Sequence, residues 1–198
     1  GNWTNGVPNG NTNNPFTING GLTADLATSV NTGGPVLRIG EAGSSGALNI
    51  NSGGPLSIGS FDLRVGNGAS GNGTVNINSG GTLTVAGGGA DLFIGDAAGG
   101  QGFVSINAGG TLDARKAVEI INGTLIFDSA ASYASGQPQD EFVVDNNGTL
   151  AFKTNGATHV TIAGDSLNLE LGSASTLDMQ LGGAFNVGDT WTIMTGIS

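Results

Sequence analysis

The sequence contains no cysteine, one histidine and only five basic residues among 198. The lack of cysteine excludes disulfides and thiolate metal sites, and it suits the surface of a bacterium better than a small eukaryotic secreted scaffold. The 15 acidic residues give a formal net charge of −10 and a sequence pI of about 4.1, so the chain repels the phosphates of nucleic acids and anionic membranes. We therefore expect no nucleic-acid binding and no membrane insertion.

Long apolar runs are also lacking, and none approaches the roughly 18 residues of a membrane-spanning helix. The first residues, GNWTNGVPNG, have neither the charged nor the apolar region of a signal peptide. We expect the chain to be a mature product or an excised domain. P-loop, zinc and dinucleotide motifs are missing too, and no stretch predicts a helix.

Glycine is the abundant residue, with 38 of the 198 positions, against about 7% in an average protein. Mean hydropathy is nevertheless +0.08, and Val, Ile and Leu recur steadily along the chain. A disordered glycine-rich tract would lack the apolar surface that offsets the entropy of ordering. The glycines are therefore expected to lie at turns of a folded chain.

One segment occurs three times, as LRIGEAGSSGALNINSGGPLSI, LRVGNGASGNGTVNINSGGTLTV and LFIGDAAGGQGFVSINAGGTLDA. Its matching glycines, Gly40, Gly66 and Gly95, are separated by 26 and 29 residues. A period of this length is typical of a solenoid, in which each unit buries its apolar face only against its neighbours.

Each copy contains three short segments with apolar residues two apart, the alternation of half-buried strands. This pattern predicts an all-β fold, a parallel β-solenoid (β-helix) with about 26–29 residues per coil and three short strands per coil. Residues between the inward pairs then point outward and form columns from coil to coil. The inward pairs are Leu37/Ile39, Leu48/Ile50, Leu56/Ile58, Leu63/Val65, Val75/Ile77, Leu83/Val85, Leu92/Ile94, Val104/Ile106 and Leu112/Ala114.

A corner with a repeated composition separates the second and third strands of each copy. Asparagine is followed there by a small residue and a Gly-Gly pair that we expect to need positive φ. Stacked asparagine side chains can hydrogen-bond from coil to coil. The predicted corner ladder consists of Asn51, Asn78, Asn107, Gly54, Gly81 and Gly110.

The chain divides by regularity into three parts of one continuous domain. We assign 1–35 to an N-terminal cap and first coil, 36–115 to regular repeat coils, and 116–198 to irregular coils and C-terminal strands. Within the last part, SYASGQPQDEF at 132–142 is expected to be a loop. Apolar alternation returns from Leu167 to Leu181 and predicts further coils or a closing sheet.

We predict no catalytic residues. Asp113, Arg115, Lys116 and Glu119 form the densest charged cluster, which we interpret as a solvated rung with local salt bridges rather than a lyase-like acid and base. The only histidine, His159, is expected to point outward, and no nucleophile-elbow motif supports a catalytic triad.

Calcium is the one cofactor with a sequence signal. AGGGADLFI at 86–94 partly matches the nonapeptide calcium repeat and includes Asp91. The corner row Glu41, Asn67, Asp96 is a second candidate. A plain turn is the favoured interpretation of 86–94, because calcium sites of this kind need carboxylates repeated on successive half-turns and the motif occurs once. The corner row is also the composition expected of a solvated bend. Without calcium, no cofactor is expected.

Several motifs resemble those of bacterial autotransporter passengers and autotransporter-associated repeats: NWTNGVPN near the start, FTINGG, the repeated INxGGxL, and GDTWTIMTG at 188–196. The resemblance covers most of the chain and implies an extracellular or cell-surface location, with a role in adhesion, matrix or surface-layer structure. A C-terminal membrane barrel is common in that family but is not expected here, so we expect either a cleaved chain or a different anchorage.

The leading hypothesis is a non-catalytic structural protein that forms a fibre, matrix or adhesive layer by end-to-end self-association. TWTIMTGIS carries an apolar strand with almost no charge, and exposed strand edges promote pairing. The expected assembly end comprises Trp191, Ile193 and Met194.

The alternative hypothesis is a module that binds or cleaves carbohydrate, for example a cell-surface glycan. Sugar stacking needs exposed aromatic rings, and these are expected at Phe61, Phe93, Phe103 and Tyr133 and at the two tryptophans, out of register. Ice binding by threonine columns is a third reading, weakened because Pro55 and Asp113 interrupt the rows.

Overall fold

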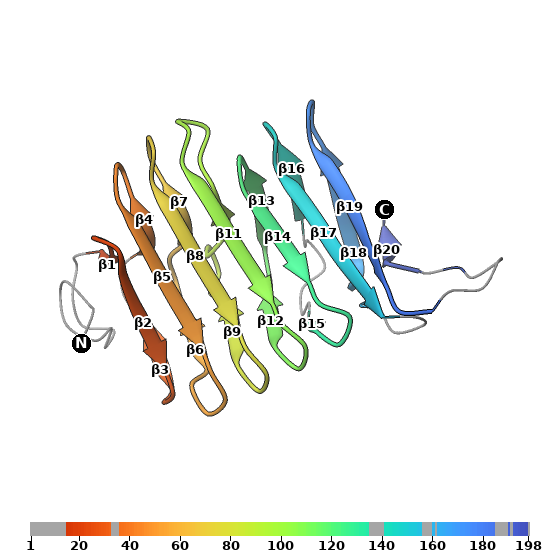
Figure 1. Ribbon diagram of the computed structural model, residues 1–198, viewed down its shortest axis with the longest axis horizontal. Coiled ribbons are helices and arrows are strands. Elements are labelled where there is room, and N and C mark those ends of the chain that lie inside the picture. The colour runs from red at the N-terminus through yellow and green to blue at the C-terminus, as the bar shows by residue number, and fades with distance from the viewer. Residues whose placement is uncertain are drawn as a thin grey trace.

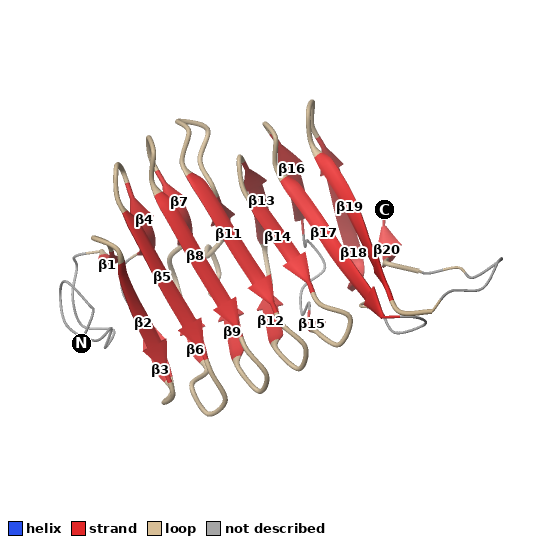
Figure 2. Cartoon of the chain, in the orientation of Figure 1, coloured by secondary structure: helices blue, strands red, loops and turns tan. Residues whose placement is uncertain are grey.

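The computed structural model describes residues 15–32, 36–134, 141–155, 160, 162–184, 190 and 192–197. All regular elements in these ranges are β-strands, and all strand pairs are parallel. The strands form three sheets stacked as a β-solenoid of about five turns with three strands per coil (Figures 1 and 2). The sequence prediction of an all-β parallel β-solenoid is therefore confirmed. The described residues contain no helix with the length and apolarity needed to cross a membrane.

Strands of the same sheet come from successive coils and lie side by side along the solenoid (Figure 1). The first sheet contains β1 (Phe16–Ile18), β4 (Leu37–Glu41), β7 (Leu63–Asn67), β10 (Leu92–Ile94), β13 (Ala117–Ile121), β16 (Glu141–Asp145), β18 (Ile162–Leu171) and β20 (Met194–Ile197). The second contains β2 (Leu22–Leu26), β5 (Ser45–Ile50), β8 (Asn72–Ile77), β11 (Gln101–Ile106), β14 (Thr124–Phe127), β17 (Thr149–Asn155) and β19 (Thr176–Gly182). The third contains β3 (Val30–Thr32), β6 (Leu56–Ile58), β9 (Thr82–Val85), β12 (Thr111–Ala114) and β15 (Ser132–Ala134).

The core is a set of inward columns that run along the solenoid. All eighteen residues of the predicted inward pairs are at most 1% exposed. Because successive side chains of a strand point to opposite faces, the residues between them form the expected outward columns. The outward columns in register are Arg38/Arg64/Phe93, Asn49/Asn76/Ser105 and Ser57/Thr84/Asp113.

The two glycines of each Gly-Gly corner have different structural roles. Gly80 has φ +72°, a conformation that glycine adopts without steric cost. Gly81 is not in the positive-φ region, so the expected positive φ of the corner belongs to the first glycine of the pair. Instead, a Cβ at Gly81 would overlap the carbonyl oxygen of Ile50 in the preceding coil. Gly54 and Gly110 meet the carbonyls of Leu26 and Ile77 in the same way.

Among the described strands the third sheet ends at β15, and aromatic side chains pack next to this strand. The ring of Phe127 stacks on Phe152 with centroids 5.6 Å apart and meets Tyr133 edge-on at 6.1 Å. Tyr133 also contacts Phe142 at 5.4 Å. The three phenylalanines are fully buried. Large rings replace the aliphatic wall that a further strand would supply.

This aromatic cluster corrects the expected loop at 132–142. Ser132–Ala134 forms β15, and Glu141 and Phe142 open β16, so only 135–140, which lie outside the described residues, separate the two strands. The polar composition predicted a turn, but Tyr133 and Phe142 gain more by burying their rings in strands at the core.

Candidate functional site

The predicted corner asparagines form a hydrogen-bonded ladder. Asn78 Nδ2 donates to Asn51 Oδ1, and Asn107 Nδ2 donates to Asn78 Oδ1, both at 2.8 Å. A second ladder runs along the outward face of the second sheet, where Asn76 donates to Asn49 at 2.9 Å and Asn49 donates to Asp25 at 2.7 Å. Each rung ties neighbouring coils together, so the ladders support the fold.

Asn78 is the middle asparagine of the corner ladder, so truncating its side chain should lower the stability of the fold. In Asn78→Ala, Asn51 loses a donor and Asn107 loses an acceptor, and we expect the free energy of unfolding to fall by about 1–2 kcal/mol. Asn31→Ala is the matched control, because among the described residues the exposed Asn31 side chain has no hydrogen-bond partner. Urea titration of both variants measures the difference, and equal losses would show that the ladder adds no stability.

The three calcium candidates lie in separate local contacts. Asp91 accepts from Lys116 Nζ at 3.0 Å and from the Ala117 backbone at 3.2 Å. Asp96 accepts from the Ala98 backbone at 2.7 Å, and Glu41 binds Arg38 at 2.8 Å. Across the described residues no three His, Asp or Glu side chains gather as a metal site would need.

The predicted charged cluster is divided into separate ion pairs, and one of its acids is half-buried. Arg115 contacts Asp113 at 2.9 Å, and Lys116 contacts Asp91 at 3.0 Å. Burial, followed by the neighbouring charges of Asp91 and Glu141, raises the pKa of Glu119 above its ordinary value. The cations are thus engaged by carboxylates, as in a solvated rung with local salt bridges.

The two arginines on the outward face of the first sheet each form an ion pair with a nearby carboxylate. Arg38 pairs with Glu41, and Arg64 pairs with Asp62 at 2.9 Å. The Arg64 guanidinium also lies 4.4 Å from the ring centroid of Phe93, a cation–π contact. Arg64 therefore covers one face of the Phe93 ring.

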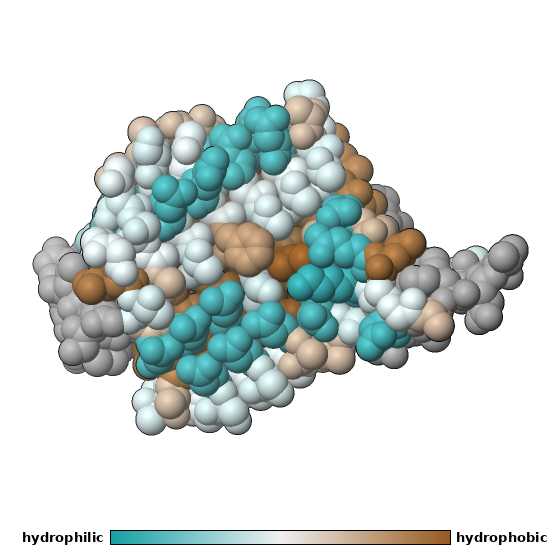
Figure 3. Space-filling view, in the orientation of Figure 1, coloured by the Kyte–Doolittle hydropathy of each residue, from teal (hydrophilic) through white to brown (hydrophobic). Residues whose placement is uncertain are grey.

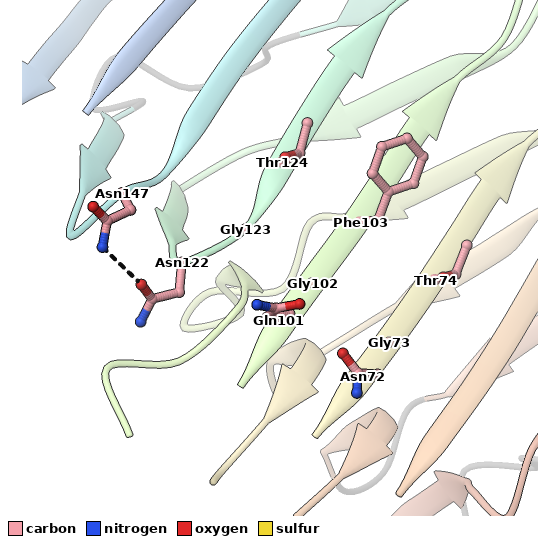
Figure 4. Close-up of a pocket in the computed structure, with 10 residues that line it drawn as sticks. All are labelled: Asn72, Gly73, Thr74, Gln101, Gly102, Phe103, Asn122, Gly123, Thr124 and Asn147. Atoms are coloured by element: carbon pink, nitrogen blue, oxygen red, sulfur yellow. Dashed lines mark hydrogen bonds between the residues drawn. The ribbon is translucent and has the colours of Figure 1, made fainter. Parts of the chain in front are cut away.

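The outward face of the second sheet carries a groove of about 350 Å³ (Figure 4). In the space-filling view, an apolar patch at the centre of this face lies between hydrophilic bands (Figure 3). No charged side chain is among the described residues that line the groove. They are Asn72, Gly73, Thr74, Gln101, Gly102, Phe103, Asn122, Gly123, Thr124 and Asn147.

Phe103 is the central feature of the groove and is 41% exposed. Strand register places Thr74 on one side of it and Thr124 on the other. Both neighbours are short, so they leave part of the ring open to solvent (Figure 4). The sequence predicted an exposed ring at Phe103. Tyr133, expected to be exposed as well, instead packs against the core and donates its hydroxyl to the Ala114 carbonyl at 3.2 Å.

Amide side chains line the rim of the groove. Asn147 Nδ2 donates to Asn122 Oδ1 at 3.3 Å (Figure 4), and Asn122 Nδ2 donates to the Asp96 carbonyl at 3.0 Å. Asn72 and Gln101 are exposed and lie in register. Within the described part of the chain their amides make no hydrogen bond. Each retains donors and an acceptor for a ligand.

The C-terminal end of the solenoid exposes three leucines at positions that are buried in other coils. Leu171 is in register with Val144, Leu177 with Leu150, and Leu181 with Thr154. The partners are at most 3% exposed, whereas these leucines are 51%, 41% and 58% exposed. The last coil thus presents part of its inward face. The alternation of apolar residues from Leu167 to Leu181 already marked these leucines in the sequence. The assembly end was nevertheless expected nearer the C-terminus, at Trp191, Ile193 and Met194.

The residues of that expected assembly end have different locations. Trp191 lies outside the described residues, as does His159. Ile193 is half-buried and packs against the core. Met194 begins β20, and its side chain is outside the described ones. Among the side chains that the structure describes at this end, the large exposed apolar ones are Leu171 of β18 and Leu177 and Leu181 of β19.

A scan against protein-family models and searches of the curated proteins and of the solved structures found no match to this chain.

Proposed function

We propose that this chain is a non-catalytic structural protein of the bacterial cell surface, in which coil ends of successive copies stack into a fibre, matrix or adhesive layer. The observation that carries the proposal is the inward face of the last coil, with Leu171, Leu177 and Leu181 exposed. Apolar surface gathered at one place on a protein marks an interaction site. The extracellular location rests on the resemblance to autotransporter passengers.

A second copy of the chain is a suitable partner for this end, because in this fold each coil is covered by the next coil. β19 is the edge strand of the second sheet, so its outer backbone groups are available for pairing. Each inner coil is covered by another coil whose strands are in register with it and whose inward apolar residues have the same spacing. The N-terminal end of a further copy supplies edge strands, β1 and β2, that belong to the same two sheets.

The two ends of the solenoid are not equivalent. At the N-terminal end, Phe16, Ile18, Ala24 and Leu26 are at most 5% exposed although β1 and β2 are edge strands. Head-to-tail stacking runs on into a fibre, whereas joining two C-terminal ends about a two-fold axis closes at a dimer. The size of the assembly therefore distinguishes the two arrangements.

A structural role is also supported by how the charged side chains are used. Asp113 and Arg115 bind each other, as do Asp91 and Lys116, so these charges stabilise the rungs. Most glycoside hydrolases need a pair of carboxyl groups flanking the scissile bond, and the described groove residues on the second sheet include no carboxylate. We propose no enzymatic activity.

The assembly is tested with Leu181→Lys, which places a charge on the exposed end. Covering one leucine contributes about 1.5–3 kcal/mol, and 1.4 kcal/mol corresponds to a tenfold change in affinity. We therefore expect the variant to weaken self-association at least about tenfold. Sedimentation velocity over a range of concentrations, with negative-stain electron microscopy of the same samples, measures the effect.

Phe61→Lys is the matched control, because Phe61 is 48% exposed and lies between β6 and β7, away from either end. It should assemble as the unaltered chain does. Short monodisperse rods of the unaltered chain at all concentrations would contradict the proposal, and a population that stops at dimers would contradict the fibre.

A further inference from the structure

The groove around Phe103 is separate from the end that is proposed to stack. Its residues come from β8, β11 and β14 and from the turns before β14 and β17, in the middle of the solenoid (Figures 1 and 4). Stacking of coil ends leaves this face open, so whatever the groove binds is a second property of the molecule.

The shape of the groove favours a chain-like ligand. Its residues span four successive coils, which at about 4.8 Å per coil gives a length of about 14 Å. A smaller hollow of about 190 Å³ continues along the same face towards the N-terminal end. The two share Asn72 and Thr74, and the second reaches Leu22, which is 42% exposed. An oligomer lying along the solenoid fits this outline better than a single small ring.

The chemistry of the lining favours a neutral ligand with both an apolar face and hydroxyl groups. The Phe103 ring is a flat apolar platform, and the unpaired amides of Asn72 and Gln101 both donate and accept. The ten lining residues are uncharged, and the net charge of the protein is −10, which disfavours an anionic polymer. A sugar ring combines an apolar face of C–H groups with equatorial hydroxyls that amides can bind.

Strand pairing holds these groups in place before any ligand arrives. Phe103 lies in β11, which pairs along its length with β8 and at four positions with β14. Asn122 is held between Asn147 and the Asp96 carbonyl, so it orients Asn147 at the rim. A rigid site loses little conformational entropy on binding.

From these observations we propose that the groove binds a neutral oligosaccharide, with one sugar ring stacked on Phe103 and hydroxyl groups hydrogen-bonded to Gln101 and Asn72. The groove is a binding site, and the ligand leaves it chemically unchanged. This inference stands independently of end-to-end stacking, since none of its residues belongs to the C-terminal end.

The test uses the whole chain and a fixed set of probes: the hexasaccharides of cellulose, amylose, laminarin, xylan, mannan and chitin, with hexagalacturonate as an anionic comparator. Isothermal titration calorimetry and chemical-shift mapping report binding. We expect at least one neutral hexasaccharide to bind and to shift the backbone signals of Gln101 and Phe103, and hexagalacturonate to bind more weakly. Binding by none of the neutral probes, or preferential binding of hexagalacturonate, overturns the proposal.

Two substitutions of Phe103 then test whether the bound sugar stacks on its ring. Phe103→Ala should lower the affinity for the bound hexasaccharide at least tenfold, and Phe103→Leu, which keeps an apolar side chain without an aromatic face, should lower it severalfold. Phe103 is on the outer face, and an unchanged thermal midpoint of each variant checks the fold. Phe61→Ala removes an equally exposed ring elsewhere and should bind as the unaltered chain does. An affinity unaffected by Phe103→Ala, or reduced equally by Phe61→Ala, overturns the assignment.

Discussion

Replacing Phe142 with alanine should lower the free energy of unfolding by about 3–5 kcal/mol, as expected for deleting a fully buried aromatic ring. Phe142 is 0% exposed, lies in register between Val118 and Leu169, and contacts the Tyr133 ring. No strand of the third sheet follows β15 in the described part of the chain. Because β16 pairs with β13 on one side and β18 on the other, its backbone is held in place and cannot readily move to close the cavity.

The loss should be confined to the coils around the cavity. Coils of a solenoid contact only their neighbours, so stability is approximately a sum of local terms. Hydrogen exchange should become faster in β15 and β16 and stay unchanged in β5. Phe61→Ala is the control, because Phe61 is 48% exposed and should change the stability by less than about 0.5 kcal/mol. A Phe142→Ala variant as stable as this control would show that the aromatic cluster does not support the fold.

Gly81→Ala should be the most damaging of the single-methyl substitutions considered, with a loss of about 3 kcal/mol, at the upper end of what overpacking costs. The added Cβ would overlap the Ile50 carbonyl and lie 2.9 Å from the Asn78 carbonyl. Both are backbone atoms in paired coils, where Asn78 N donates to the Ile50 carbonyl at 2.9 Å. Strands that pair on both sides cannot move apart without breaking hydrogen bonds.

Gly88→Ala is the matched control for Gly81→Ala. Gly88 is exposed, has no positive φ, and a Cβ there would meet nothing within 4 Å. Alanine should leave the stability unchanged or raise it slightly, because it reduces the entropy of the unfolded chain. Guanidinium titration of the two variants compares them directly. Similar midpoints would mean that the corner adjusts to a methyl group and that close coil approach does not require glycine.

The regular coils were predictable because their information is local. Alternation two apart specifies which face of a strand is buried, and a period of 26–29 residues specifies which strands become neighbours. Leu83 and Val85 could therefore be assigned to the core, and Arg64 and Phe93 to one outward column, before any coordinates.

The irregular coils were less predictable because the repeat no longer aligns them. The sequence did not show that Thr124 would flank Phe103 from the other side or that Asn147 would reach the rim of the groove. It also misassigned Tyr133 and Phe142 to a loop, because the polar residues between them dominate the local composition. Ring burial depends on where the third sheet stops, which no local pattern records.

By itself the sequence determined the all-β solenoid, the coil length, the inward columns and the corner asparagines, since each follows from a pattern repeated within the chain. Only the tertiary structure decided which corner glycine is required for close approach, where the aromatic cluster closes the third side, and which side chains frame Phe103. It alone showed that Leu171, Leu177 and Leu181 stay exposed. The physical reason is that a side chain's burial depends on the coil stacked above it, and that coil is distant in sequence.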